Sequence, residues 1–399
     1  MQLVTEEVKG FLGNSSMIRR MFEAGIELKK RYGEDKVYDF SLGNPDLPPP
    51  PQIKEAMTEL AAESDRPFAF GYMPNAGEPA ARQALAELVS REQGIAVPWR
   101  NIVVTVGAAG GINALFRAVL ERGDEVICPS PYFVEYGFYV GNFGGRLKPV
   151  ATKPDFALDT DAIAAAITPA TRAVILNSPN NPTGKIYTRA ELTAVTDLLR
   201  AARAKTGRMI YLIADEPYRF LNFDGAEIPS MLDLYDGAVV IGSFSKSLSL
   251  PGERIGYAAV SPKLENADEL LGALTLTNRI LGFVNAPCIG QRLMKAALGT
   301  SADASEYILR RKLMADVLTD AGLTFTMPAG TFYFFPQAPN AMNDVEFVNM
   351  LADERILVVP GSGFGYPGYF RIALCVDTKY IELSRAGFKR AVARALNKN

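Results

Sequence analysis

The chain has 399 residues, of which 48% are hydrophobic and 22% are charged, and its 42 basic and 44 acidic side chains give a net charge of -2. This length exceeds one ordinary hydrophobic core, so we expect a large and a smaller domain, and the balanced charge argues against a protein that binds nucleic acid or an anionic membrane surface. The sequence contains no histidine, which excludes Ser-His-Asp and Cys-His catalysis and histidine-based metal sites, and we predict no metal.

The cysteine pattern and the N-terminus bear on the cellular compartment. Cys128, Cys288 and Cys375 are far apart and lack Cys-x-x-Cys spacing, which is typical of thiols in a reducing compartment. The N-terminus lacks the apolar core of a signal peptide, and the apolar run at residues 102–116 is broken by glycines, as in a strand, turn and helix. We therefore expect a cytoplasmic protein that does not bind membranes.

Strands and helices alternate through the middle of the chain. From residue 101 to residue 261, short apolar runs alternate with helical patterns, including a helix expected over residues 189–205. This alternation is typical of an α/β fold with a mostly parallel sheet flanked by helices. We predict a large cofactor-binding domain over residues 47–285 and a small α/β domain built from residues 1–46 and 286–399.

A glycine-rich turn and an aromatic residue follow the first strands of this region. Gly107 begins a turn into a helix, where the backbone N–H groups of Ala108, Ala109 and Gly110 would form an anion site. The turn matches neither Gly-x-Gly-x-x-Gly nor the Walker spacing, which disfavours a nucleotide site. Phe133 offers a face for a flat ring, although packing in the core is the commoner role of such a side chain.

Two polar segments follow the next predicted strands. Asn181 lies in a segment rich in Asn and Pro, and its amide can donate to a phenolate oxygen or a carboxylate. Asp215 ends a later strand, where a buried carboxylate requires a cation such as a protonated pyridine nitrogen, and Tyr218 follows three residues later. An exposed loop carboxylate and a packed tyrosine are the alternatives for these residues.

Lys246 lies in a serine-rich turn directly after the apolar strand at residues 238–241. Desolvation there would lower the pKa of the lysine, and a neutral amine can form a Schiff base with a carbonyl group. The hydroxyls of Ser243 and Ser245 and the guanidinium of Arg254 suit a phosphate. Taken alone, this segment is equally well explained by a solvated lysine in a loop.

Together these segments resemble the class I and II aminotransferases of fold type I, the aspartate aminotransferase superfamily. Each match is weak alone, but the ordered set is specific and extends along essentially the full chain. The matching segments are Gly43-Asn44-Pro45-Asp46, Tyr72 five residues before Gly77, Asn181-Pro182-Thr183-Gly184, Asp215-Glu216-Pro217-Tyr218, Ser243-x-Ser-Lys246 with Arg254, and a terminal strand with Arg371.

The resemblance implies a homodimeric, pyridoxal 5′-phosphate-dependent enzyme that moves an amino group from an L-amino acid to a 2-oxo acid, with 2-oxoglutarate as the expected acceptor, by a ping-pong mechanism. Lys246 would hold the cofactor as a Schiff base and transfer the proton, and Asp215 would keep the pyridine nitrogen protonated. Arg371 would bind the substrate α-carboxylate together with Asn181 and the Gly43 backbone. The other implied cofactor contacts are Tyr218, Asn181 and Phe133 at the ring, and Ser243, Ser245, Arg254, the Ala108, Ala109 and Gly110 amides and Tyr72 of a partner subunit at the phosphate.

The chain departs from aspartate-specific members at two positions. Tyr136 stands where some of them have a histidine bonded to the pyridinium aspartate, and Ala109 stands where one branch has a lysine for the second substrate carboxylate. We therefore expect neutral or aromatic donors to react faster than aspartate, unless Arg19, Arg20 or Arg279 supplies a cation. Side chains expected beside such a donor are Tyr136, Phe332 and Tyr333.

Two alternatives to an aminotransferase remain. A carbon–sulfur β-lyase or an amino-acid decarboxylase would share the same segments, so the sequence discriminates poorly between these reactions. A transcriptional regulator with an aminotransferase-like body would need a DNA-binding domain, for which we expect too few residues ahead of the proline run at 48–51.

Overall fold

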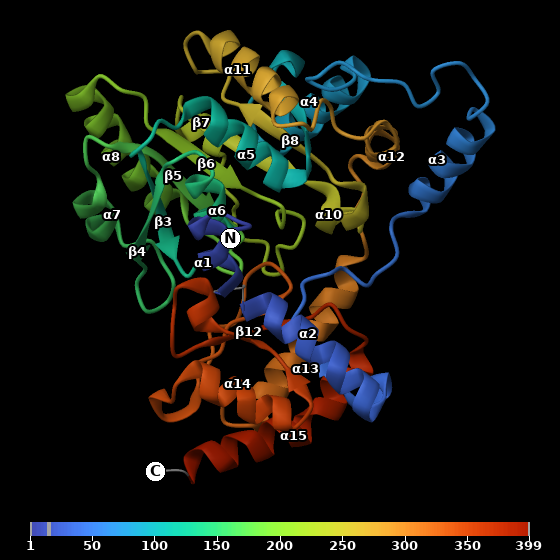
Figure 1. Cartoon of the computed structure of the whole chain (residues 1–399), viewed down its shortest axis with the longest axis vertical. Helices are drawn as coiled ribbons and strands as arrows, with labels where there is room; N and C mark the ends of the chain where they lie inside the picture. Colours follow the sequence, from blue (N-terminus) through green and yellow to red (C-terminus); the bar gives the residue numbers. More distant parts are fainter. Residues whose placement is uncertain (1, 14–16, 398–399) are drawn as a thin grey trace. The chain divides into compact units, whose positions relative to one another are not determined.

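The structure is a computed structural model in which residues 2–13 and 17–397 are described, and the chain divides into two compact units (Figure 1). The first unit consists of Met1–Gly43, Ser305–Pro328 and Phe332–Asn399. The second unit consists of Asn44–Ala304 and Ala329–Thr331. Within the described residues, no helix is both long enough and apolar enough to cross a membrane.

The second unit is built on a mostly parallel sheet (Figure 1). Within the described residues this sheet has seven strands in the order β2-β8-β7-β6-β5-β3-β4, and β8 pairs antiparallel with both of its neighbours. The strands are β2 (Ile102–Val106), β3 (Glu125–Ser130), β4 (Arg146–Ala151), β5 (Thr171–Asn177), β6 (Tyr211–Asp215), β7 (Ala238–Ser243) and β8 (Ile255–Val260). This architecture confirms the predicted fold class.

Helices cover both faces of this sheet. Ala238 and Val240 of β7 join a buried cluster with side chains of α3, α4, α8 and α12, whereas Val239 and Ile241 join a second cluster with side chains of α5, α6 and α11. Burial on both faces explains why the strands are continuous apolar runs in the sequence. The helices of the unit are α3 (Pro51–Ala62), α4 (Pro79–Gln93), η2 (Trp99–Asn101), α5 (Gly107–Val119), α6 (Glu135–Gly141), α7 (Thr160–Ala166), α8 (Arg189–Thr206), α9 (Met231–Leu234), α10 (Phe244–Ser247), η3 (Pro251–Glu253), α11 (Ala267–Ile280) and α12 (Cys288–Ala297).

Local signals define α8 at both ends. The Thr188 side chain accepts from the backbone N–H of Glu191, and the Glu191 carboxylate accepts from the backbone N–H of Thr188 at 2.7 Å, so the two residues form a capping box. Gly207 follows the helix in the left-handed conformation with φ of 67°. The helix expected over residues 189–205 is confirmed, and these local signals explain why the sequence could predict it.

The first unit combines short strands with helices. β1 (Tyr38–Asp39) pairs parallel with β10 (Ile356–Leu357). β12 (Phe370–Ala373) lies between β11 (Val359–Pro360) and β9 (Tyr333–Phe334) and is antiparallel to both. The helices are α1 (Glu6–Gly13), α2 (Met17–Tyr32), η1 (Glu34–Lys36), α13 (Ala304–Asp320), η4 (Pro339–Ala341), α14 (Asp344–Asp353), η5 (Gly361–Phe364) and α15 (Thr378–Leu396).

The boundary between the units differs from the predicted one at residues 285 and 286. The structure places α12 in the second unit, where it packs against α3 and α4. Leu293 and Met294 of α12 are buried in the cluster beneath these helices, so the apolar face of α12 belongs to the sheet unit. An amphipathic helix near a boundary can cover either core, and the sequence does not say which.

Candidate active site

The polar segments singled out in the sequence lie at one edge of the large sheet. Asn177 ends β5 and Asp215 ends β6, and these two residues are paired across the parallel strands. Asp215 is in turn paired with Ile241, two residues before the end of β7 at Ser243. Because carboxyl ends of parallel strands share one edge, this is where an α/β sheet binds ligands.

Lys246 lies in α10, the short helix that begins directly after β7. Ser243 caps this helix, because its Oγ accepts from the Ser245 backbone N–H at 3.2 Å and lies 3.0 Å from the Ser245 hydroxyl oxygen. The lysine side chain is half-buried. The turn therefore holds one amine and two hydroxyls at the tip of a buried strand.

The antiparallel strand β8 brings Arg254 to the N-terminus of α5. Val106, the last residue of β2, pairs with Ile255, the first residue of β8. A Cβ atom built on Gly107 would lie 2.9 Å from Nη2 of Arg254, and Gly107 has φ of +65°. The left-handed backbone conformation favours glycine at this position, and the missing side chain leaves room for the Arg254 guanidinium.

The first turn of α5 places backbone amides beside the Arg254 guanidinium. The helix begins at Gly107, so its N–H groups without an intrahelical acceptor belong to Gly107, Ala108 and Ala109, one residue earlier than predicted. The N–H of Gly110 is the first one in the helix that has an intrahelical acceptor. An exposed guanidinium beside a helix N-terminus is suited to a phosphate dianion.

The buried Asp215 carboxylate has one hydrogen-bonded oxygen and one oxygen with no hydrogen-bond partner among the described residues. Its Oδ2 accepts a hydrogen bond of 2.5 Å from the Tyr136 hydroxyl, whereas its Oδ1 has no hydrogen-bond partner among the described residues. Burial raises the pKa of Asp215 to about 6, and the bond from Tyr136 opposes this shift. A cationic N–H donor facing Oδ1 would satisfy the oxygen and favour the ionised carboxylate.

Asn177 links Asp215 to the predicted ring contact Asn181. The Asn177 side-chain amide donates to the backbone carbonyl of Asp215 at 2.8 Å, and its oxygen accepts from the backbone N–H of Asn181 at 2.6 Å. Asn181 and Tyr218 are both buried. Asn177 received no role from the sequence, although its place at the end of a strand adjacent to β6 is the signal that identifies it.

Tyr136 joins Asp215 to the predicted stacking residue Phe133. The two rings meet edge to face, with centroids 5.6 Å apart at 86°, and Phe133 itself is half-buried. Tyr136 was expected beside the substrate side chain, but its ring is buried in the core and its hydroxyl bonds to Asp215. That expectation is corrected, because the first turn of α6 directs Tyr136 toward the sheet.

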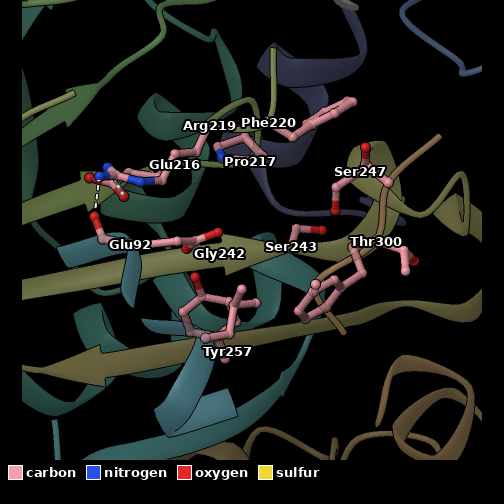
Figure 2. Close-up of a pocket in the computed structure, with 14 residues that line it drawn as sticks. Glu92, Glu216, Pro217, Arg219, Phe220, Gly242, Ser243, Ser247, Tyr257 and Thr300 are labelled. Atoms are coloured by element: carbon pink, nitrogen blue, oxygen red, sulfur yellow. Dashed lines mark hydrogen bonds and ion pairs between the residues drawn. The ribbon is translucent and has the colours of Figure 1, made fainter. Parts of the chain in front are cut away.

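A second buried carboxylate lies on the α4 side of the sheet (Figure 2). Oε2 of Glu216 accepts from Gln93 at 2.9 Å and from Arg219 at 3.1 Å, and Arg219 also donates to the backbone carbonyl of Glu92. Oε1 of Glu216 is buried and has no hydrogen-bond partner among the described residues. Glu216 and Gly242 are among the residues that line a pocket of about 320 Å³. Burial raises the pKa of Glu216 to about 7, and Arg219 opposes this shift.

Two of the three predicted carboxylate-binding residues, Arg371 and Gly43, lie in the first unit. Arg371 on β12 is 3% exposed and donates from Nη2 to the Ser41 carbonyl at 2.7 Å. Its guanidinium carbon lies 4.4 Å from the ring centre of Tyr333 and 4.8 Å from that of Phe364. A Cβ atom on Gly43 would lie 1.8 Å from the Tyr333 hydroxyl oxygen, so only glycine fits there. Tyr333 thus contacts both predicted residues.

The remaining predicted residues differ in their exposure. Tyr72 is 93% exposed and Arg279, at the end of α11, is also exposed. Arg19 and Arg20 fall in α2, and their side chains lie outside the described part of the structure. Phe332 is fully buried and packs on another aromatic ring of the first unit.

Residues 35–384 match the family model of aminotransferase class I and II. The chain belongs to this aminotransferase family. The aminotransferase is 32% identical to the aspartate/prephenate aminotransferase of Thermus thermophilus over 376 residues, which are 93% of this chain and 94% of that protein. It is 29% identical to the aromatic-amino-acid aminotransferase 2 of Thermococcus litoralis, over 94% of each chain. A solved amino transferase from Eubacterium rectale matches 100% of both chains with a TM-score of 0.94 and 37% identity.

The cofactor of this aminotransferase is pyridoxal 5′-phosphate, on which the family depends. The residues at the sheet edge fit that molecule. Asp215 offers a buried oxygen without a partner among the described residues to a ring N–H, and Gly107 leaves room for Arg254 beside free helix amides, where a phosphate can bind. Lys246 provides the amine. The family membership confirms both the resemblance and the enzyme class.

Proposed function

We propose that this aminotransferase moves an amino group from an L-amino acid to a 2-oxo acid, with 2-oxoglutarate as acceptor, in two successive half-reactions. The observation that carries the proposal is the buried, half-satisfied carboxylate of Asp215 at the same sheet edge as Lys246. When bound, the cofactor supplies a carbonyl that combines with amines and a ring that accepts the electrons released at the substrate Cα.

Within this proposal, each residue binds a particular group or moves a particular proton. Nζ of Lys246 holds the cofactor and then transfers the proton between the substrate Cα and the cofactor. Oδ1 of Asp215 accepts from the ring N–H. The remaining contacts are Tyr218 and Asn181 at the ring oxygen, Phe133 at the ring face, and Ser243, Ser245, Arg254 and the amides of the first turn of α5 at the phosphate.

Arg371 binds the substrate α-carboxylate in this proposal. Tyr333 and Phe364 flank its guanidinium, and the bond to Ser41 restrains Nη2. A guanidinium held in this way loses little conformational freedom when it forms two parallel bonds to a carboxylate. The guanidinium is therefore oriented before the substrate arrives.

We also infer that the active enzyme is a homodimer in which Tyr72 reaches the phosphate site of its partner. Phe68 and Tyr72 are 92% and 93% exposed, and Phe70 between them is 52% exposed. Three exposed aromatic side chains within five residues are typical of a surface that another subunit covers. Sedimentation of the enzyme at assay concentration should show a dimer, and a fully active monomer would contradict the inference.

The donor is proposed to be a neutral or aromatic amino acid that reacts faster than aspartate. Ala109, at the N-terminus of α5, has no charge to offer a second carboxylate, and an unpaired buried carboxylate is costly. The relatives are named for aspartate and prephenate and for aromatic amino acids, so both classes of donor should be assayed. The cysteine pattern supports action in the reducing cytoplasm.

Reduction with borohydride tests the proposed role of Lys246. Reduction should fix a pyridoxyl group on the peptide that contains Lys246, and Lys246→Ala should lose turnover while it still binds the cofactor. Label on another lysine would refute the assignment. Mixing the enzyme with each amino acid and following both the cofactor spectrum and the products separates amino transfer from a β-lyase or decarboxylase reaction, because only amino transfer yields the matching 2-oxo acid.

A further inference from the structure

Asp39 is a carboxylate at the end of β1 in the first unit, and none of the roles proposed above uses it. It is paired with Leu357 of the parallel strand β10. The next residue, Phe40, has main-chain hydrogen bonds on both sides. Its N–H donates to the Leu357 carbonyl at 2.8 Å, and its carbonyl accepts from the N–H of Ala373 at 2.9 Å. The backbone is therefore fixed by main-chain bonds as far as Phe40.

The Asp39 side chain fixes the residue that follows, Ser41. Oδ1 of Asp39 accepts from the Ser41 backbone N–H at 3.2 Å and from the Ser41 hydroxyl at 2.6 Å. This is the pattern of an Asx turn, in which a side chain takes the place of a main-chain acceptor. Ser41 is fully buried, so both bonds are shielded from water and restrain the peptide that carries the Ser41 carbonyl.

The Ser41 carbonyl is the acceptor that restrains Arg371. Nη2 of Arg371 donates to this carbonyl at 2.7 Å, and the arginine is itself buried. Gly43 comes two residues after Ser41, and its missing side chain leaves room for the Tyr333 hydroxyl. The turn at Asp39 therefore begins the short segment that holds the Arg371 guanidinium and leads to the Gly43 backbone.

Lys29 of α2 holds the other oxygen of Asp39. Its Nζ lies 2.7 Å from Oδ2, and the side chains of Lys29 and Asp39 are 33% and 15% exposed, so this ion pair is less screened by water than a surface pair. α2 lies close to the carboxylate at Gly25, where a Cβ atom would be 3.3 Å from Oδ2 and 2.9 Å from Cδ1 of Leu357. With Oδ2 on the ammonium group, Oδ1 stays directed at Ser41.

We propose that Asp39 is a positioning residue for the recognition of the substrate α-carboxylate. By fixing Ser41, the Asp39 carboxylate keeps the Arg371 guanidinium in place, and it sets the path of the chain to Gly43. Lys29 contributes by holding Asp39. The proposal rests on the proposed role of Arg371, and it links α2 to the binding of every substrate that has an α-carboxylate.

The physical reason is preorganisation. A guanidinium forms two parallel bonds to a carboxylate only in one orientation, and the bond to Ser41 restricts its rotation before the substrate binds. Without the Asp39 carboxylate, the Ser41 N–H and hydroxyl would be buried donors without this acceptor, and the peptide would turn toward other partners. Loss of a hydrogen bond to a charged group corresponds to a change of about tenfold to hundredfold in an equilibrium or rate.

The experiment compares two amines that differ in the carboxylate. Phenylalanine and 2-phenylethylamine have the same ring and the same amino group, but only phenylalanine has a carboxylate. Stopped-flow absorbance of the enzyme loaded with its cofactor gives a second-order rate constant for each amine, and the ratio of the two constants measures what the carboxylate contributes. In Asp39→Ala this ratio should fall by about tenfold to hundredfold, while the constant for 2-phenylethylamine changes by less than about twofold.

Further variants separate positioning from a merely structural role. Asp39→Asn keeps an oxygen that can accept from Ser41, and it should retain most of the wild-type ratio. Asp320→Ala removes another carboxylate of the first unit, which pairs with Arg385, and it should leave the ratio unchanged. In an Arg371→Leu background, Asp39→Ala should lower the ratio no further, because both changes act through the same guanidinium. If Asp39→Ala is insoluble, Asp39→Glu, which displaces the acceptor from Ser41, is measured instead and should show the same selective loss.

Each outcome bears on a particular proposal. A wild-type enzyme that reacts equally fast with both amines would refute the proposed role of Arg371, and the inference about Asp39 with it. A wild-type preference for phenylalanine that persists in Asp39→Ala would overturn only the inference about Asp39. An equal loss of both rate constants in Asp39→Ala would also overturn it, because the role would then be structural. A loss in Asp39→Ala that is confined to phenylalanine, with the ratio retained in Asp39→Asn, supports both proposals.

Discussion

Glu216 should make the stability of the second unit depend on pH. Its carboxyl is 5% exposed, and burial raises its pKa from 4.5 to about 7. The folded state therefore keeps a proton that the unfolded state has already released in this range. A raised pKa of this kind contributes stability that is fully present below about pH 4.5 and is lost as the pH rises through about 7. At 1.36 kcal/mol per pH unit, the loss amounts to about 3 kcal/mol.

Glu216→Gln removes this titration and keeps the shape of the side chain. The amide oxygen of the variant can still accept from Gln93 and Arg219, whose bonds to Glu216 are 2.9 Å and 3.1 Å long. The variant should therefore gain stability relative to the wild type as the pH rises, by most of about 3 kcal/mol between about pH 5 and about pH 8. Other groups titrate in both proteins and cancel in the difference.

Trp99 provides the assay, because it is the single tryptophan of the chain and lies in η2 of the second unit. Its fluorescence during urea unfolding yields the free energy of unfolding at each pH. Glu87→Gln, which changes an exposed side chain on α4, is the matched control and should follow the wild type. A difference between Glu216→Gln and the wild type that stays constant over this pH range would refute the reasoning.

Three further predictions concern the active site. Tyr333→Leu removes one of the two rings that flank the Arg371 guanidinium. Because a cation–π interaction of about 0.5–2 kcal/mol is lost, KM for the amino acid should rise by about tenfold, with a smaller change in kcat. An unchanged KM in steady-state assays would contradict this prediction. Gly107→Ala places a Cβ atom 2.9 Å from Nη2 of Arg254 at a backbone φ of +65°. The variant can relieve about 1–2 kcal/mol of backbone strain only by moving this turn, so equilibrium dialysis should show a cofactor affinity about fivefold to thirtyfold weaker. Unchanged affinity would rule out a phosphate at this turn. Phenylalanine should react faster than aspartate in the first half-reaction, measured by stopped-flow absorbance. If aspartate reacts faster by about tenfold, or about 1.4 kcal/mol of barrier, a cation elsewhere in the site must bind its side-chain carboxylate, because Ala109 carries no charge.

Much of this protein could be predicted from its sequence because the signals are local. Continuous apolar runs alternate with helical patterns, and this is sufficient for an α/β sheet covered on both faces. Asp215 comes directly after such a run and Lys246 comes five residues after another, and the carboxyl ends of parallel strands meet at one edge whatever the register. The capping residues of α8 set its ends without help from the rest of the chain.

The tertiary structure decided which side chains meet, since contacts between distant segments depend on strand direction and on helix orientation. Arg254 reaches Gly107 only because β8 is antiparallel in an otherwise parallel sheet. The hydroxyl of Tyr136 reaches Asp215 across 79 positions of sequence, and only the packing of α6 on the sheet selects that partner. Burial likewise gives Glu216 its raised pKa. These residues can be found in the sequence, but their contacts and pKa values depend on neighbours that only the folded chain brings to them.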